Sequence, residues 1–218
     1  MTEKTNPMYG KIKPKISGEH NTMVRTGVVR LSFPNILAPQ KTDDGNEKYG
    51  ASLLFPEDSP TDKAIKQAIQ AAIKEGSAGI WAGRAPKKPA LTYGDGNDTD
   101  YAGYEDMMFI RCSSNSKPGA VMKAPAGYPG KLKPIDSEED LYAGCYVIAT
   151  IRIAPYDYKG KKGITAYIDN IMKFSDGERF GGGQTAEQAF GDDDLLDLIP
   201  DGDEDLFGDD GDVDDFLS

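Results

Sequence analysis

The chain has 218 residues and a formal net charge of −11, which it carries with only one histidine and two cysteines. The lone His20 excludes Ser-His-Asp and Cys-His catalysis and any metal site that needs two imidazoles. Cys112 and Cys145 lie too far apart to form a CxxC pair, so we expect them to be buried free thiols and expect no metal site.

The charge is divided unevenly between a body and a tail. Residues 184–218 hold 14 of the 36 acidic residues and no basic one, so the body, residues 1–183, has a charge of about +3. A run of like charge this dense predicts a disordered acidic tail. Apolar pairs recur in it, the last of them flanked by Asp214 and Asp215 as Phe216-Leu217. Such alternation is typical of segments that dock on a partner protein, although a solubilising tail is the simpler alternative.

The rest of the chain predicts a short arm and one domain. Residues 1–24 are rich in Gly, Pro and Lys, and we expect a flexible N-terminal arm there. The arm has no apolar run that could serve as a signal peptide or membrane span, so a cytoplasmic location is expected. Residues 25–183 have the size of a single domain with one core.

Two alternating segments predict the first hairpin. In residues 26–33 (TGVVRLSF), Val29, Leu31 and Phe33 fall on one face and Arg30 on the other, and Pro34 is expected to end the strand. Residues 48–55 (KYGASLLF) repeat the alternation after a turn-rich loop.

One helix is predicted over about residues 59–75. Ser59 is expected to be its N-cap, Pro60 its first residue, and Gly76 its end. The irregular stretch that follows contains the only tryptophan, Trp81, and a basic cluster, residues 84–88 (RAPKK).

Three further strands, and a short one over 120–123, are predicted at residues 107–113, 145–154 and 163–174. Five strands of this kind with long loops favour a small antiparallel barrel, closed or half-open, with the helix inserted between the second and third strands. Exposed strand edges make a homodimer possible.

The register of the last hairpin follows if the hairpin is symmetric about its turn. Pairing Pro155 with Ile164 brings the inward residues of both strands together, and it then places Arg152 opposite Tyr167 on the outer face. The loop over 156–162 adds two tyrosines and three lysines at one tip.

Cationic and aromatic residues on the outer strand faces predict a surface for single-stranded nucleic acid, whose phosphates need cations and whose bases need flat faces for stacking. Each basic residue taken alone could be an ordinary solvated charge, and Phe109 and Tyr146 could instead belong to a core under a loop. The candidates are Arg30, Lys48, Phe109, Arg111, Tyr146, Arg152, Tyr156, Tyr158, Lys159, Lys161, Lys162 and Tyr167.

Two alternatives stay open. Asp95, Asp98 and Asp100 could serve a metal-dependent nuclease. The same stretch looks faintly like a calcium loop, but it has Asp100 at the sixth place, where such a loop needs Gly. The protein could also be an acidic DNA mimic or adaptor whose tail is its function. No Walker or dinucleotide motif is present, so no nucleotide cofactor is expected.

The sequence resembles a bacteriophage family of single-stranded DNA-binding proteins. The resemblance is carried by residues 29–34 (VRLSFP), 48–56 (KYGASLLFP), 142–147 (YAGCYV), 162–164 (KGI) and 176–182 (DGERFGG). It implies an OB-fold core, non-enzymatic binding in DNA replication or recombination, and an acidic tail that competes with DNA. The ending Asp214-Asp215-Phe216-Leu217-Ser218 is similar to the tips that bind replication and repair proteins, but it lacks the bacterial Ile-Pro-Phe terminus.

Overall fold

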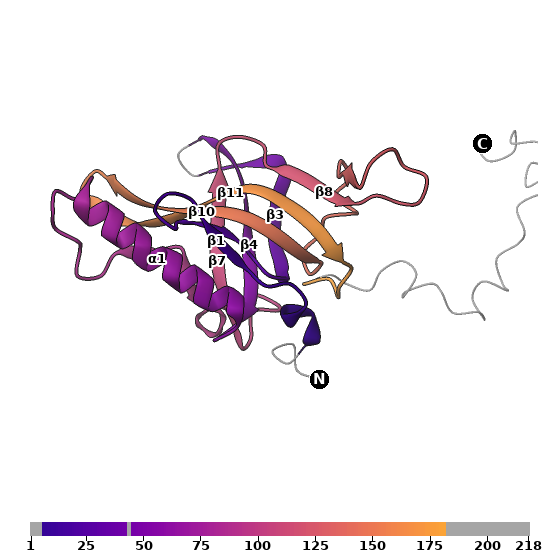
Figure 1. Ribbon diagram of the computed structural model, residues 1–218, viewed down its shortest axis with the longest axis horizontal. Helices are drawn as coiled ribbons and strands as arrows, with labels where there is room; N and C mark the ends of the chain where they lie inside the picture. Colours follow the sequence, from indigo (N-terminus) through magenta and orange to yellow (C-terminus); the bar gives the residue numbers. More distant parts are fainter. Residues whose placement is uncertain (1–5, 43–44, 182–218) are drawn as a thin grey trace, which may run out of the picture. The chain divides into compact units, whose positions relative to one another are not determined.

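The computed structural model describes residues 6–42 and 45–181, and its centre is a closed barrel of five strands (Figure 1). Around the barrel each strand pairs with the next, and the last pairs with the first. In this order the strands are β3 (Val29–Lys41), β4 (Glu47–Pro56), β7 (Met107–Ser114), β11 (Lys161–Ser175) and β10 (Tyr146–Tyr158). The predicted mainly β, OB-fold-like barrel with one helix is confirmed.

One pair of barrel strands is parallel, where the sequence predicted antiparallel pairing throughout. β7 and β11 run in the same direction, with Ala166 opposite Cys112 and Tyr167 opposite Ser113. A closed ring with an odd number of strands cannot alternate in direction at every contact, so one parallel pair is unavoidable. The long connection over residues 115–145 allows it by taking the chain past the place that β11 later fills.

Shorter strands extend the sheet on both sides of the barrel, and the path of paired strands ends at β1 and β9. β6 pairs with β7, whereas β5 and β8 run parallel to β11. These strands are β1 (Lys15–Ser17), β2 (Met23–Arg25), β5 (Ala90–Leu91), β6 (Tyr93–Asp95), β8 (Gly119–Lys123) and β9 (Leu132–Pro134). Within the described residues, 3-10 helices lie at η2 (Pro7–Gly10) and η3 (Gly96–Asp98).

Residues 6–24 belong to the folded domain, where a flexible arm was expected. β2 pairs with β10, and Tyr9 of η2 is buried against Tyr146 with ring centres 6.1 Å apart. The side-chain amide of Asn6 also donates a hydrogen bond of 2.6 Å to the Tyr146 hydroxyl. Strands of three residues are too short to produce a periodic pattern, so periodicity could not indicate them.

The α-helix α1 (Pro60–Ala78) lies along one side of the barrel and begins as predicted (Figure 1). The Ser59 hydroxyl accepts a hydrogen bond of 3.2 Å from the backbone N–H of Asp62. The helix continues past Gly76, which is not its end. A Cβ on Gly76 would lie 2.7 Å from Pro155 and 2.8 Å from Trp81, so this glycine allows close packing instead of ending the helix.

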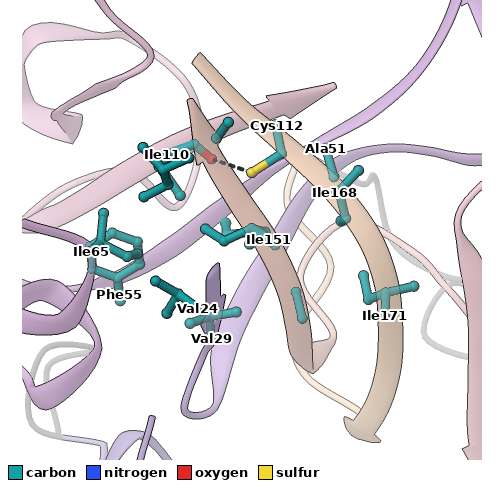
Figure 2. Packing of buried hydrophobic residues seen from close by; sticks show 14 of the residues in the cluster. Val24, Val29, Ala51, Phe55, Ile65, Ile110, Cys112, Ile151, Ile168 and Ile171 are labelled. Carbon is teal, nitrogen blue, oxygen red and sulfur yellow. Dashed lines mark hydrogen bonds between the residues drawn. The ribbon is translucent and has the colours of Figure 1, made fainter. Parts of the chain in front are cut away.

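The main core fills the barrel and the space beneath α1 (Figure 2). The predicted inward residues Val29, Leu31 and Ile151 are almost fully buried. Phe33 is the exception, because it adopts a φ of +47° at an irregularity in the pairing with β4 and is 48% exposed. The strand also continues through Pro34, and Ile36 takes the next inward place.

Candidate nucleic-acid interface

The predicted contact between Arg152 and Tyr167 is confirmed. The two residues are paired across β10 and β11, and the guanidinium carbon lies 4.7 Å from the centre of the tyrosine ring. Pro155 pairs with Ile164, as expected for a symmetric hairpin, and the register shifts further along, between Thr150 and Ile151. A guanidinium stacked on an aromatic ring gives a flat, positively charged surface.

The hairpin is longer than expected, because residues 156–158 and 161–162 are strand, not loop. Only Lys159 and Gly160 form the turn, with φ of +51° and +80°. Two successive positive φ values are typical of the tight turns that match the twist of two paired strands.

A line of cationic and aromatic side chains therefore follows the outer face of the hairpin. Tyr156 is paired with Gly163, and Tyr158 with Lys161, on the same face as Arg152 and Tyr167 because side chains alternate along a strand. Tyr158 is 64% exposed. We call Arg152, Tyr167, Tyr156, Tyr158 and Lys161 the hairpin stripe.

The stripe meets a groove on the barrel wall. Tyr167 lies beside Ser113 of β7, which in turn is paired with Gly50 of β4. Ser113 and Gly50 line a cavity of about 320 Å³, together with the predicted residues Lys48 and Arg111. The structure thus brings candidates from β4, β7, β10 and β11 onto one continuous face.

A second lobe of about 640 Å³ extends this groove, and it contains residues that the sequence did not indicate. The two lobes share Phe33 and Tyr101, both 48% exposed, with ring centres 5.0 Å apart. Arg179 and Phe180 also line the second lobe. We call both lobes together the barrel groove. Alternation assigned Phe33 to the wrong face. Arg179 and Phe180 lie in residues 176–182, which carry the family resemblance, but they were not among the predicted binding residues.

Arg30 does not lie on the open outer face, contrary to the prediction. Its side chain is 3% exposed, and its guanidinium carbon lies 4.9 Å from the ring centre of Tyr146 and 4.4 Å from that of Phe180. Its Nη2 donates a hydrogen bond of 2.6 Å to the carbonyl oxygen of Glu178. Residues 176–181, which follow β11, cover it.

Phe109 and Tyr146 also lie on a covered part of the outer face. They therefore fit the alternative in which they belong to a core under a loop. They are 7% and 6% exposed and pack in a second apolar cluster with Leu54 and Tyr104. The exposed Arg111 guanidinium lies 5.0 Å from the Phe109 ring centre. Phe109 therefore supports a groove residue from beneath.

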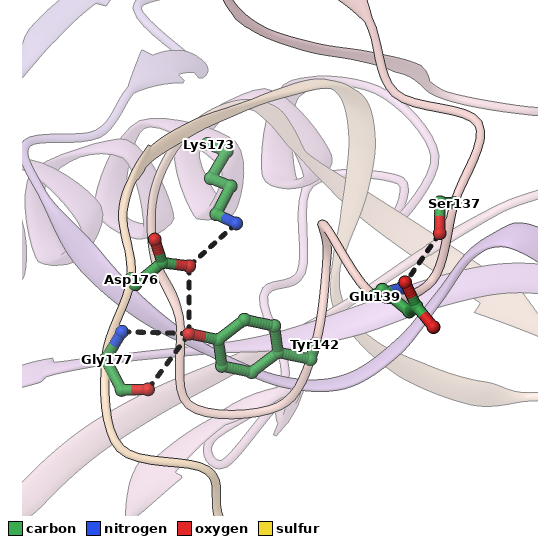
Figure 3. Close-up of polar contacts among 6 residues, drawn as sticks. All are labelled: Ser137, Glu139, Tyr142, Lys173, Asp176 and Gly177. Carbon is green, nitrogen blue, oxygen red and sulfur yellow. Dashed lines mark hydrogen bonds and ion pairs between the residues drawn. The ribbon is translucent and has the colours of Figure 1, made fainter. Parts of the chain in front are cut away.

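The Tyr142 hydroxyl holds residues 176–181 against the barrel (Figure 3). It lies 3.0 Å from Asp176 Oδ1 and accepts a hydrogen bond of 3.1 Å from the Gly177 N–H. Lys173 pairs with Asp176 at 2.8 Å, and this contact lowers the pKa of the carboxyl. The Arg179 guanidinium carbon lies 4.0 Å from the centre of the Tyr142 ring, so Tyr142 also positions a cation at the groove.

The structure gives no support to a carboxylate site at Asp95, Asp98 and Asp100. Asp95 accepts a hydrogen bond from the Asn97 N–H, and within residues 6–42 and 45–181 no three His, Cys, Asp or Glu side chains gather as metal ligands. No helix in these ranges is long and apolar enough to cross a membrane. Cys112 and Cys145 are buried free thiols, as predicted.

The predicted partner-binding residues Asp214, Asp215, Phe216 and Leu217 lie outside the described residues, as does the whole acidic tail over 184–218.

Two phage proteins are similar to this chain over most of its length. Protein p50 of Acyrthosiphon pisum secondary endosymbiont phage 1 is 29% identical over 174 residues, which cover 75% of this chain and 89% of that protein. The single-stranded DNA-binding protein of bacteriophage Enc34, solved in complex with single-stranded DNA, matches with a TM-score of 0.61 and 26% identity, covering 78% of this chain and 99% of that one.

A more distant structure shares the fold alone. The bacteriophage T7 single-stranded DNA-binding protein gp2.5 matches with a TM-score of 0.50 and 12% identity, covering 84% of this chain and 97% of that one. The model of the Enterobacter phage Enc34 single-stranded DNA-binding protein family matches residues 22–199. The chain therefore belongs to the Enc34 family of phage single-stranded DNA-binding proteins.

Proposed function

We propose that this protein binds single-stranded DNA through the barrel groove and the hairpin stripe, with little sequence preference. The observation that supports this most is the continuity between the Arg152–Tyr167 pair and the groove residues Lys48 and Arg111. Stacking accepts any base, because every base has a flat face, and phosphates carry no sequence information.

The charge of the body makes this binding dependent on salt. A body charge of about +3 is modest, so the cations have to be concentrated where the strand lies. Each neutralised phosphate releases counterions, and affinity should fall steeply as salt rises.

The acidic tail gives the second part of the proposal. Residues 184–218 hold 14 carboxylates, and such a segment competes with phosphates for the same cations. When DNA displaces it, the tip with Asp214, Asp215, Phe216 and Leu217 becomes available to a replication or recombination protein. The protein would act in the host cytoplasm, coat replication intermediates as a binding protein without catalysis or cofactor, and could do so as a homodimer.

A fluorescence titration tests the proposal. Full-length protein is titrated into a labelled deoxythymidine oligonucleotide and into a duplex of equal length, at several salt concentrations. We expect tighter binding to the single strand, weakened by Arg111→Gln and unaffected by the matched change Lys63→Gln on the exposed side of α1. Equal binding to both nucleic acids, or none, would overturn it.

The acidic mimic or adaptor remains the second candidate, and the same assay separates it. A mimic needs no DNA-binding body, so a chain ending at Gly183 would not bind the oligonucleotide. Binding by that truncated chain would exclude the tail as the whole function.

A further inference from the structure

The basic cluster over 84–88 lies at the tip of the β10–β11 hairpin, although the two are far apart in sequence. β5 pairs with β11 in parallel, Ala90 opposite Gly163 and Leu91 opposite Ile164. In a parallel pair, the residues before Ala90 run the same way as the residues before Gly163, which is toward the hairpin tip. Lys87 and Lys88 are therefore carried toward Lys161 and Lys162.

Two contacts fix this arrangement beyond the short strand. The Trp81 indole N–H donates a hydrogen bond of 3.0 Å to the carbonyl oxygen of Tyr156, and Trp81 itself is 1% exposed. A Cβ on Gly163 would lie 2.5 Å from the Ala90 carbonyl oxygen and 2.7 Å from the Tyr156 ring. The loop is thus anchored at its start by Trp81 and at its end by β5.

Several cations consequently gather around the tip of the β10–β11 hairpin, a region that we call the basic pole. It consists of Arg84, Lys87, Lys88, Lys159, Lys161 and Lys162. All but Lys162 are exposed, and the Lys162 ammonium lies 3.8 Å from the Asp157 carboxylate. Like charges that share one region repel each other, so a polyanion that neutralises them is favoured there.

The basic pole is continuous with the hairpin stripe. Tyr158 and Lys161 form the outer end of the stripe, and Arg152 lies six residues before Tyr158 on β10. At about 3.3 Å per residue this separates the Arg152–Tyr167 pair from the tip by roughly 20 Å. Single-stranded DNA that leaves the barrel groove along the stripe would thus arrive between Lys161 and the 84–88 cluster.

We infer that Arg84, Lys87 and Lys88 form a second phosphate-binding site, which extends the path of single-stranded DNA beyond the barrel groove. This inference rests on the proposed function, since it requires a strand that already occupies the groove and the stripe. The ligand is the sugar-phosphate backbone, because the 84–88 cluster itself contributes charge but no aromatic ring.

The test compares two oligonucleotide lengths over a salt series. A deoxythymidine oligonucleotide of about 4 nucleotides fills the groove alone, and one of about 16 nucleotides also reaches the pole. These two lengths span the range of site sizes of single OB-folds. The variant R84Q/K87Q/K88Q is compared with wild type and with K11Q/K13Q/K15Q, an equal charge change at exposed lysines of the N-terminal segment.

We expect the pole variant to weaken binding of the long strand and to lower the slope of log affinity against log salt by about 2, since each single-strand phosphate contact contributes about 0.7. Between 50 and 200 mM salt the wild type then loses about 15-fold more affinity than the variant. Binding of the short strand stays unchanged, and the control variant keeps the wild-type slope. The single changes K87Q and K88Q each lower the slope by about 0.7, which covers the case that the triple variant does not fold.

Several outcomes would overturn the inference. An unchanged slope with the long strand, or the same fall in the control variant, would show that the pole adds no local phosphate contact. The pole variant could instead bind polyglutamate less tightly than wild type and bind both DNA strands equally well. The pole would then be a docking surface for acidic protein segments and not a DNA contact. If wild type bound neither strand, the proposed function itself would fail, which is a different result from either of these.

Discussion

Arg30 donates a 2.6 Å hydrogen bond to the carbonyl oxygen of Glu178, a residue 148 positions away in the chain. The guanidinium also contacts the rings of Tyr146 and Phe180, and it fastens residues 176–181 over the outer face of the barrel. The same residues supply Arg179 and Phe180 to the barrel groove. A buried arginine therefore shapes the DNA-binding surface that we propose without lying on it.

Replacing Arg30 by Ala should destabilise the fold. The change removes a charge-assisted hydrogen bond and two cation–π contacts, for an expected loss of about 3 kcal/mol in the free energy of unfolding. Urea denaturation measures this loss, with Arg84→Ala, at an exposed position, as a control expected to change stability by less than about 0.5 kcal/mol. Equal stability of the two variants would contradict the role of Arg30 as a clamp.

Changes at the Arg152–Tyr167 pair should act on DNA binding and leave stability nearly unchanged. Tyr167→Ala removes a stacking surface, and we expect a loss of about 1–3 kcal/mol in binding free energy. Arg152→Ala should lower the salt slope by about 0.7. Oligonucleotide titration and thermal unfolding of each variant check both statements. A folded double variant with wild-type affinity would rule out this pair as a contact.

Removing the tail after Gly183 should tighten binding of single-stranded DNA, most clearly at low salt. The tail competes by electrostatic attraction, and that attraction is screened as the Debye length shortens from about 30 Å at 0.01 M to about 8 Å at 0.15 M. The affinities of the full-length and truncated chains should therefore converge as salt rises. Identical affinities over the whole titration would exclude competition.

Asp62 is expected to be a stabilising buried charge at the start of α1. Its carboxylate accepts hydrogen bonds from the Tyr93 hydroxyl at 2.7 Å and the Asp58 N–H at 2.8 Å, and it is 0% exposed. Lys66 completes the site at 2.8 Å. Asp62→Ala removes both hydrogen bonds and the ion pair with Lys66, so we expect a loss of about 3 kcal/mol in the free energy of unfolding.

A double-mutant cycle gives the control for Asp62. Tyr93→Phe alone should cost about 1 kcal/mol, because it removes one hydrogen bond. In the Asp62→Ala background the same change should cost nothing further, since the acceptor is already absent. Additive losses, read from urea denaturation, would show that the two side chains are not coupled.

The thiol of Cys145 should react slowly in the folded protein. Burial raises its pKa to about 11, so only about 1% is thiolate at pH 9. The pKa of this thiol in the folded protein is higher than its unfolded value of 9.0. The protonated thiol therefore contributes to the free energy of unfolding below pH 9, and this contribution is lost as the pH rises toward 11. Alkylation by iodoacetamide at pH 9, with and without urea, measures the difference. Equal rates would contradict burial of the thiol.

Local chemistry was sufficient for the elements that can be read over a few residues. Ser59 and Pro60 determined where α1 begins, because the cap is a contact between near neighbours. The register at the tip of the last hairpin followed from alternation together with a symmetric turn, which place Arg152 opposite Tyr167. The register shift between Thr150 and Ile151 carried no such signal.

Only the tertiary structure decided which face of β3 is covered and which residues line the groove. Alternation placed Arg30 outward, yet residues 176–181 bury it, and a positive φ turns Phe33 outward where a regular strand would bury it. Tyr101 and Arg179 reach the groove from segments that share no local pattern with it. Sequence periodicity indicates the face of a strand to which a side chain points. Burial of that face by a distant segment depends on contacts that form only when the barrel closes.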